Sequence, residues 1–187
     1  MSNFLKPLNE PFSDDVAQKL SVYPRIQGQL LALFRTFANS ARFLDKGVPN
    51  LLDPDSPLPL KMREIVILRT CFRQNCEYEW GVHAAVFGEA ADLTAQRLND
   101  TCSPAPDKIL WSQEELTLIE IVDQLCSKGD ISPREQKLLA KYWSPEQQLE
   151  IFALCGTYHT VSFVANVAEL ETEAFANRFP EAERSGT

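Results

Sequence analysis

Histidines and paired cysteines are what this 187-residue chain most clearly lacks. It has only two histidines, His83 and His159, so a metal centre built from several imidazoles is excluded. Its five cysteines include no C-x-x-C pair. An odd number of irregularly spaced cysteines is typical of free thiols in a reducing compartment, and we therefore predict a cytoplasmic protein.

Positive charge is not concentrated anywhere along the chain. The 18 lysines and arginines are scattered and outnumbered by 26 aspartates and glutamates, which gives a formal net charge of −8. Nucleic acids and anionic membranes are bound by basic patches, so neither is expected as a partner. Every long apolar stretch is interrupted by charged or polar residues, which predicts no membrane-spanning helix. The acidic, proline-broken first fifteen residues do not have the pattern of a signal peptide.

No stretch alternates between apolar and polar residues as a half-buried strand does. Helical periodicity and capping sequences predict helices throughout the chain. The expected helices cover about residues 26–46, 60–73, 75–88, 92–99, 112–128, 132–142 and 144–170. We predict a single all-α domain over residues 1–187 with no sheet. The last of the C-terminal helices (112–170) is apolar nearly all round and is expected at the centre of the core.

A proline-rich connector separates the first of these helices from the second. Residues 47–59 read G-V-P-N-L-L-D-P-D-S-P-L-P, and four prolines in thirteen residues exclude a helix. The connector is therefore either the rim of a functional site or a long turn.

Residues 63–89 carry the side chains best suited to chemistry. Glu64 interrupts an otherwise apolar helical run, and Cys76 opens the next helix. At about 100° per residue, Cys76, Glu79 and His83 share one stripe of that second helix with large apolar residues. An acid, a thiol and an imidazole are thus predicted to face the interior together.

Each of these residues has a functional and a purely structural interpretation. The helix N-terminus would stabilise a Cys76 thiolate, but a free cysteine is often only a small buried apolar side chain. Glu79 and His83, four residues apart, are expected to hydrogen-bond, so that the carboxylate fixes the imidazole tautomer and the pair transfers a proton. The alternative is a surface pair that stabilises the helix. It fits poorly with the position of both residues on the apolar side of the helix.

Glu64 needs a partner if it lies in the interior. Arg63, Arg69 and Arg73 are nearby in sequence, although a solvated helix face is the simpler expectation for each of them. An arginine at the mouth of the site would instead hold an anionic substrate. Zinc bound by the second-helix stripe, with Glu64 as a further ligand, is an alternative that lacks any standard ligand spacing.

A second group, Glu150, Cys155 and His159, lies on the last helix. Cys155 and His159 are four residues apart and could face each other, but Glu150 is off their stripe. The helix is otherwise apolar, so we interpret these residues as part of the core rather than as a site.

The pattern over residues 60–90 resembles the carboxymuconolactone decarboxylase and alkylhydroperoxidase D superfamily. The resemblance rests on Glu64, the run Cys76-Glu77-Tyr78-Glu79-Trp80-Gly81-Val82-His83, and a helix end at Gly88. It implies an alkylhydroperoxidase D-like helical bundle that forms a homo-oligomer. It also implies a site for a small-molecule substrate where the Glu64 and Cys76 helices meet.

The chain departs from each branch of that superfamily. The redox branch uses a C-x-x-C pair, and here Glu79 replaces the second cysteine, so no local disulfide could resolve an oxidised Cys76. The decarboxylase branch lacks both cysteines but has the Glu-x-x-x-His helix that Glu79 and His83 reproduce. For that branch the resemblance implies proton transfer without a metal or organic cofactor.

The leading hypothesis is a cofactor-free acid/base enzyme, a decarboxylase-like lyase acting on a small anionic or carbonyl substrate. His83 would transfer the proton, Glu79 would orient His83, and Glu64 would be a second acid or base. Cys76 would line the pocket or tune His83. One alternative is a peroxidase-related oxidoreductase that uses Cys76 with an external thiol. Another is a non-catalytic helical oligomer that binds a small ligand.

Overall fold

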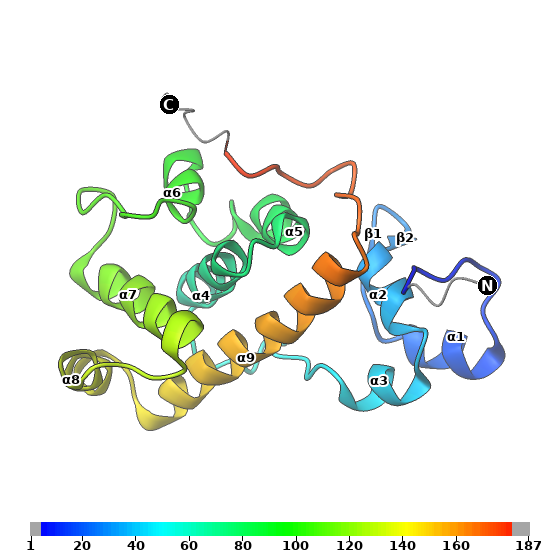
Figure 1. Cartoon of the computed structure of the whole chain (residues 1–187), viewed down its shortest axis with the longest axis horizontal. Coiled ribbons are helices and arrows are strands. Elements are labelled where there is room, and N and C mark those ends of the chain that lie inside the picture. Colours follow the sequence, from blue (N-terminus) through cyan, green and yellow to red (C-terminus); the bar gives the residue numbers. More distant parts are fainter. Residues whose placement is uncertain (1–4, 181–187) are drawn as a thin grey trace.

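The computed structural model describes residues 5–180, and most of them are helical (Figure 1). The helices are α1 (Asp14–Leu20), α2 (Ala32–Phe37), α3 (Ala41–Lys46), α4 (Leu60–Arg73), α5 (Glu77–Phe87), α6 (Ala95–Asp100), α7 (Gln113–Lys128), α8 (Pro133–Tyr142) and α9 (Pro145–Val167). Two short strands, β1 (Arg25–Ile26) and β2 (Gln29–Leu30), form an antiparallel hairpin. The all-α prediction is confirmed apart from this hairpin.

The central element is α4, whose bounds agree with the sequence prediction. It packs against α5, α7 and α9, and its residues 63–71 are all buried. Apolar side chains on nearly every side of a helix require neighbours on every side, which is what α4 has. In Figure 1, α7 and α8 form one end of the molecule, α1 to α3 form the other, and α9 runs between them.

The predicted helix over residues 26–46 is wrong. Gln27 and Gly28 both have positive φ angles, 50° and 82°, in the two-residue loop between β1 and β2. Two positive φ angles are the requirement of a type I′ hairpin turn, and they end any helix. The rest of this stretch forms two short helices, α2 and α3. Extended backbone at Ser40 separates them, and the Ser40 hydroxyl caps α3.

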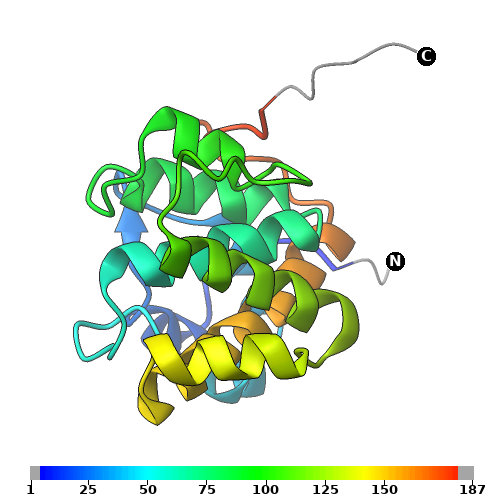
Figure 2. The same ribbon diagram turned by 90° about the vertical axis from the view of Figure 1, so that its left-hand side faces the viewer.

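Capping sequences set the starts of the C-terminal helices as expected. Complete capping boxes open α7, with Ser112 and Glu115, and α9, with Ser144 and Gln147. Gly129, in a left-handed conformation, ends α7. In Figure 2, α7 and α8 lie toward the viewer and cover that side of the bundle.

The last helix, α9, is not buried all round. Its inner face packs on α4 and α5, and Ile151 and Leu154 there are fully buried. Its outer face carries an apolar stripe, which we call the outer α9 stripe; it consists of Leu149 (68% exposed), Phe152 (38%), Phe163 (59%) and Val167 (65%). The helix is therefore an outer layer of the core rather than its centre.

Residues after α9 run back across α5. The Asn177 amide donates to the Gly81 carbonyl at 3.1 Å. A Cβ at position 81 would lie 2.1 Å from the Asn177 carbonyl oxygen, so this close approach needs glycine. Within the part of the chain that the structure describes, no helix has the length and apolarity to cross a bilayer.

Candidate functional site

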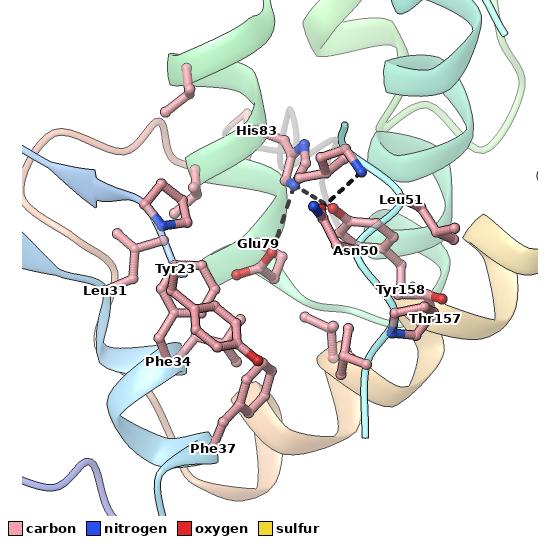
Figure 3. Close-up of a pocket in the computed structure, with 18 of the residues that line it drawn as sticks. Tyr23, Leu31, Phe34, Phe37, Asn50, Leu51, Glu79, His83, Thr157 and Tyr158 are labelled. Atoms are coloured by element: carbon pink, nitrogen blue, oxygen red, sulfur yellow. Dashed lines mark hydrogen bonds and ion pairs between the residues drawn. The ribbon is translucent and has the colours of Figure 1, made fainter. Parts of the chain in front are cut away.

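A cavity of about 700 Å³ lies between the N-terminal segment, the proline-rich connector, α5 and α9 (Figure 3). The N-terminal segment contributes residues 22–24, Ile26 and several side chains of 31–37, and the connector contributes residues 48–52. The proline-rich connector therefore forms part of the rim of this cavity. Glu79, His83 and Tyr158 bring polar groups to walls that are otherwise mostly apolar.

The His83 imidazole is held between two other helices. Its Nδ1 lies 2.7 Å from Oε2 of Glu64 on α4, and its Nε2 lies 2.8 Å from the Tyr158 hydroxyl on α9. A carboxylate only accepts hydrogen bonds, so Nδ1 carries the proton shared with Glu64. Nε2 then accepts from the Tyr158 hydroxyl when the ring is neutral and donates to it when the ring is charged.

Glu64 is fully buried and has a cationic partner of its own. The Nε of Arg63 donates to Oε1 of Glu64 at 3.3 Å, and the Arg63 guanidinium packs over the Phe87 ring. Arg63 is itself 7% exposed, so the solvated face expected for it is wrong. The reason is that a carboxylate in an apolar interior needs compensation, and the neighbouring residue supplies it.

The other two arginines of α4 serve the fold rather than the site. Arg69 is fully buried and makes a bidentate pair with Asp123 of α7, with both N–O distances at 2.7 Å. It also donates to the carbonyl oxygens of Thr101 and Ser103. Arg73 is partly exposed and lies 3.7 Å from the same aspartate.

The surroundings of His83 favour its charged form. Burial lowers the pKa of His83, but the charge of Glu64 and its hydrogen bond raise it by more, and the net pKa lies above the ordinary value. Glu64 therefore fixes the orientation of the imidazole and stabilises the proton on it.

Glu79 lines the cavity but does not orient His83, contrary to the sequence prediction. Its Oε2 is 3.8 Å from Nε2 of His83, too far for a hydrogen bond, because Glu64 and Tyr158 already occupy both ring nitrogens. Among residues 5–180, its Oε1 has no hydrogen-bond partner. Burial raises the pKa of Glu79 to about 7, although the charge of His83 lowers it. This carboxyl group can thus gain and lose a proton near neutral pH.

Tyr158 is the site residue that sequence reasoning missed. The prediction that the last helix is apolar nearly all round assigns no polar role to this residue. Burial raises the pKa of Tyr158 well above its ordinary value, and the charges of Glu79 and Glu64 add to this. The phenol therefore keeps its proton and acts as a hydrogen-bond donor. A signal was present, since a buried tyrosine hydroxyl usually has a polar partner.

Cys76 does not share the cavity with Glu79 and His83. It is the N-cap of α5, it is fully buried, and it belongs to the hydrophobic core. Burial raises the pKa of Cys76 to about 11, and the charge of Glu79 adds to the increase. Of the two interpretations of Cys76, its position fits the small buried apolar side chain, because desolvation outweighs the influence of the helix N-terminus on the thiol pKa.

The second group of residues does not come together. Cys155 is buried and accepts a long hydrogen bond from Thr70, whereas His159 is half-buried and stacks on Phe163 of the outer α9 stripe. Glu150 accepts a hydrogen bond from Ser56. The core interpretation is therefore correct for Cys155, and His159 lies nearer the surface than expected.

The described residues include no group of three or more histidine, cysteine, aspartate or glutamate side chains disposed to hold a metal ion. What the cavity does bring together is a carboxyl group that titrates near neutral pH and a phenol–imidazole pair that donates hydrogen bonds. Together these groups can remove a proton from one atom of a bound molecule and stabilise negative charge on another.

Comparisons with protein-family models and with curated proteins find no match for this chain.

Proposed function

We propose that this protein is a cofactor-free acid/base enzyme that moves a proton at a carbon next to a carbonyl group. We further propose that it belongs to the carboxymuconolactone decarboxylase-like group and has the alkylhydroperoxidase D-like fold. The observation that carries the proposal is the Glu79 carboxyl group. It is buried, one of its oxygens has no partner within residues 5–180, and it lines the same cavity as the Tyr158–His83 pair.

In the proposed reaction, Glu79 is the base. Its carboxylate takes a proton from the α-carbon, the C–H electron pair moves into the C–C bond, and the carbonyl oxygen becomes negatively charged. The Tyr158 hydroxyl donates a hydrogen bond to that oxygen, and His83 supports the phenol from Nε2. Return of the proton from Glu79 to carbon completes an isomerisation or exchange.

The roles of the other residues follow from their contacts. Glu64 is a positioning residue, since it holds the Nδ1 side of His83 and keeps Nε2 toward the cavity. Arg63 compensates the charge of Glu64. This assignment exchanges the roles that the sequence suggested for the two glutamates.

The test is exchange of α-hydrogens in D₂O, followed by proton NMR on simple ketones and 1,3-diketones. We expect exchange with the wild-type protein and a loss of at least about 100-fold in Glu79→Gln, because removal of a general base costs this much. Tyr158→Phe should lose about 100- to 1,000-fold, since one hydrogen-bond donor to the developing negative charge is removed. An exchange rate that Glu79→Gln leaves unchanged contradicts the proposal.

Ligand binding without catalysis is the second candidate, and the size of the apolar cavity favours it. Cavities of about 300–1,000 Å³ commonly hold small molecules. This candidate predicts ligand-induced stabilisation but no exchange. The peroxidase alternative has less support, since it needs an accessible thiol of low pKa and Cys76 is buried with a raised one.

We also propose a homo-oligomer in the cytoplasm. The resemblance implies the oligomer, and the exposed outer α9 stripe is a surface that a second copy would cover.

A further inference from the structure

We infer that the cavity takes a neutral, largely apolar carbonyl compound and selects against an anionic one. The inference rests on the proposed function, because it names the class of substrate on which Glu79 and Tyr158 would act. It also chooses between the anionic and carbonyl substrates that the sequence left open.

The first argument is the charge of the lining. The described residues that line the cavity include no lysine or arginine. Arg63 of α4, whose guanidinium packs over the ring of the lining residue Phe87, is already paired with Glu64 and is not part of the lining. A charged His83 is balanced only when Glu79, 3.8 Å from its Nε2, is ionised: Glu64 and Glu79 then carry two negative charges against the positive charges of Arg63 and His83. With Glu79 ionised, no cation is thus left over for a substrate carboxylate.

The second argument is the position of Glu79. An ionised Glu79 is the one acidic side chain in the described lining, and it is 5% exposed. An anion in the cavity would lie close to this carboxylate in an apolar environment, where like charges repel strongly. Binding an anion would therefore require Glu79 to be protonated, which removes the proposed base.

The third argument is the shape of the apolar lining. Figure 3 shows Leu31, Tyr23, Phe34 and Phe37 on one side of the cavity, away from His83. The Tyr23 and Phe34 rings are 4.7 Å apart and the Phe34 and Phe37 rings are 6.3 Å apart, so they form a continuous aromatic wall. A ring system of the ligand would pack on this wall.

The polar groups lie on the opposite side. In Figure 3, His83, Asn50 and Tyr158 lie together, and Glu79 stands between them and the aromatic wall. A ligand with one carbonyl group and an apolar body matches this separation. At about 30 Å³ for each water-sized group, the cavity volume of about 700 Å³ has room for roughly twenty heavy atoms, more than one ring.

Two probes of almost the same shape test the inference: 2-acetylnaphthalene, a neutral methyl ketone, and 2-naphthoate, the corresponding carboxylate. Their affinities for the full-length protein are measured by isothermal titration calorimetry at pH 6 and pH 8. We expect the ketone to bind at least about 10-fold more tightly at pH 8. The preference should shrink at pH 6, where Glu79, with a pKa of about 7, is mostly protonated. Equal or tighter binding of 2-naphthoate at pH 8 overturns the inference, as does failure of the ketone to bind at millimolar concentration.

Two variants separate charge from shape. Glu79→Gln removes the negative charge with little change in shape, and the preference for the ketone at pH 8 should fall toward that of the wild type at pH 6. Phe34→Ser removes part of the aromatic wall and should lower the affinity for both probes by the same factor. A pH 8 preference that is unchanged in Glu79→Gln contradicts the charge argument.

Exchange of the methyl hydrogens of 2-acetylnaphthalene in D₂O tests the proposed acid/base enzyme separately from the proposed selectivity for a neutral ligand. Selective binding of the ketone without exchange supports the ligand class and counts against the acid/base enzyme. Exchange together with equal binding of both probes supports the enzyme and overturns the selectivity.

Discussion

At the scale of single residues, the burial of Glu79 makes the stability of the protein depend on pH. Its pKa is about 7 in the folded chain, against an ordinary value of 4.5, because burial disfavours its charge. The folded state thus binds more protons than the unfolded state between these values, and stability falls as the pH rises from about 4.5 to 7. The raised pKa of His83 acts in the same direction, since the stability it contributes below pH 6.5 is lost as the pH rises through its folded pKa.

We therefore predict that Glu79→Gln removes most of this pH dependence. The variant should be more stable than the wild type at pH 8, by about 2–3 kcal/mol, and similar to it at pH 5. Urea unfolding of both proteins at the two pH values measures the difference. Only the part of the pH dependence that comes from His83 should remain in the variant. A stability difference between pH 5 and pH 8 as large as that of the wild type would show that Glu79 does not titrate as its burial requires.

Replacement of Cys76, unlike replacement of Glu79, is expected to leave α-hydrogen exchange nearly unchanged. Because its thiol lies in the core and away from the cavity, Cys76→Ala should keep α-hydrogen exchange within about 3-fold of the wild type and cost about 1 kcal/mol of stability. Cys155→Ala, another buried cysteine, is the matched control. The peroxidase alternative predicts instead that peroxide consumption depends on Cys76 alone. A peroxide-consuming wild type with an inactive Cys76→Ala variant would therefore favour that alternative.

The sequence predicted part of this site because helical geometry is local. An acid amid the apolar residues of α4 has to point inward, and the spacing of Glu79 and His83 places both on one side of α5. The contacts of Glu64 with His83 and of Tyr158 with His83 span 19 and 75 residues. No periodicity within one helix predicts such contacts, so the sequence assigned the hydrogen bond with His83 to Glu79 instead of Glu64 and did not predict the contact with Tyr158.

At the scale of elements, Arg69 joins helices that are distant in sequence. Its bidentate pair with Asp123 connects α4 to α7, and its bonds to two carbonyl oxygens hold the loop after α6. We predict that Arg69→Met destabilises the protein by about 3–5 kcal/mol, because Asp123 and both carbonyls lose their partner.

Arg73→Met is the matched control, on the same helix and beside the same aspartate. Its side chain is partly exposed at 3.7 Å from Asp123, so the loss should be no more than about 1 kcal/mol. Chemical unfolding of the two variants gives the comparison. Equal losses would mean that burial of the Arg69 pair has no energetic consequence.

Element boundaries were predictable where side chains cap the helix and not where the backbone turns. Ser112 and Ser144 mark helix starts through local hydrogen bonds, and α7 and α9 begin where these signals lie. The hairpin was missed because Gln27 gives no signal of its positive φ angle, and Gly28 alone is a weak one.

At the scale of the whole molecule, the outer α9 stripe bears on the proposed oligomer. Leu149 and Val167 are placed symmetrically about position 158, and Phe152 and Phe163 about nearly the same point. Two copies of α9 packed antiparallel across a two-fold axis there would place Leu149 of each copy beside Val167 of the partner subunit. A two-fold interface must be self-complementary in this way, and the spacing along α9 meets that requirement.

We predict that light scattering will give a mass that is a multiple of the 21.1 kDa chain. The double variant Leu149→Ser, Phe163→Ser should shift the protein toward the monomer without loss of helical circular dichroism, since both side chains are exposed in the single chain. Ile109→Ser removes an equally apolar side chain, 91% exposed but distant from α9 in sequence, and should leave the mass unchanged. A 21.1 kDa species at high protein concentration would rule out the oligomer. An oligomer that survives the double variant would show that its interface lies on another face.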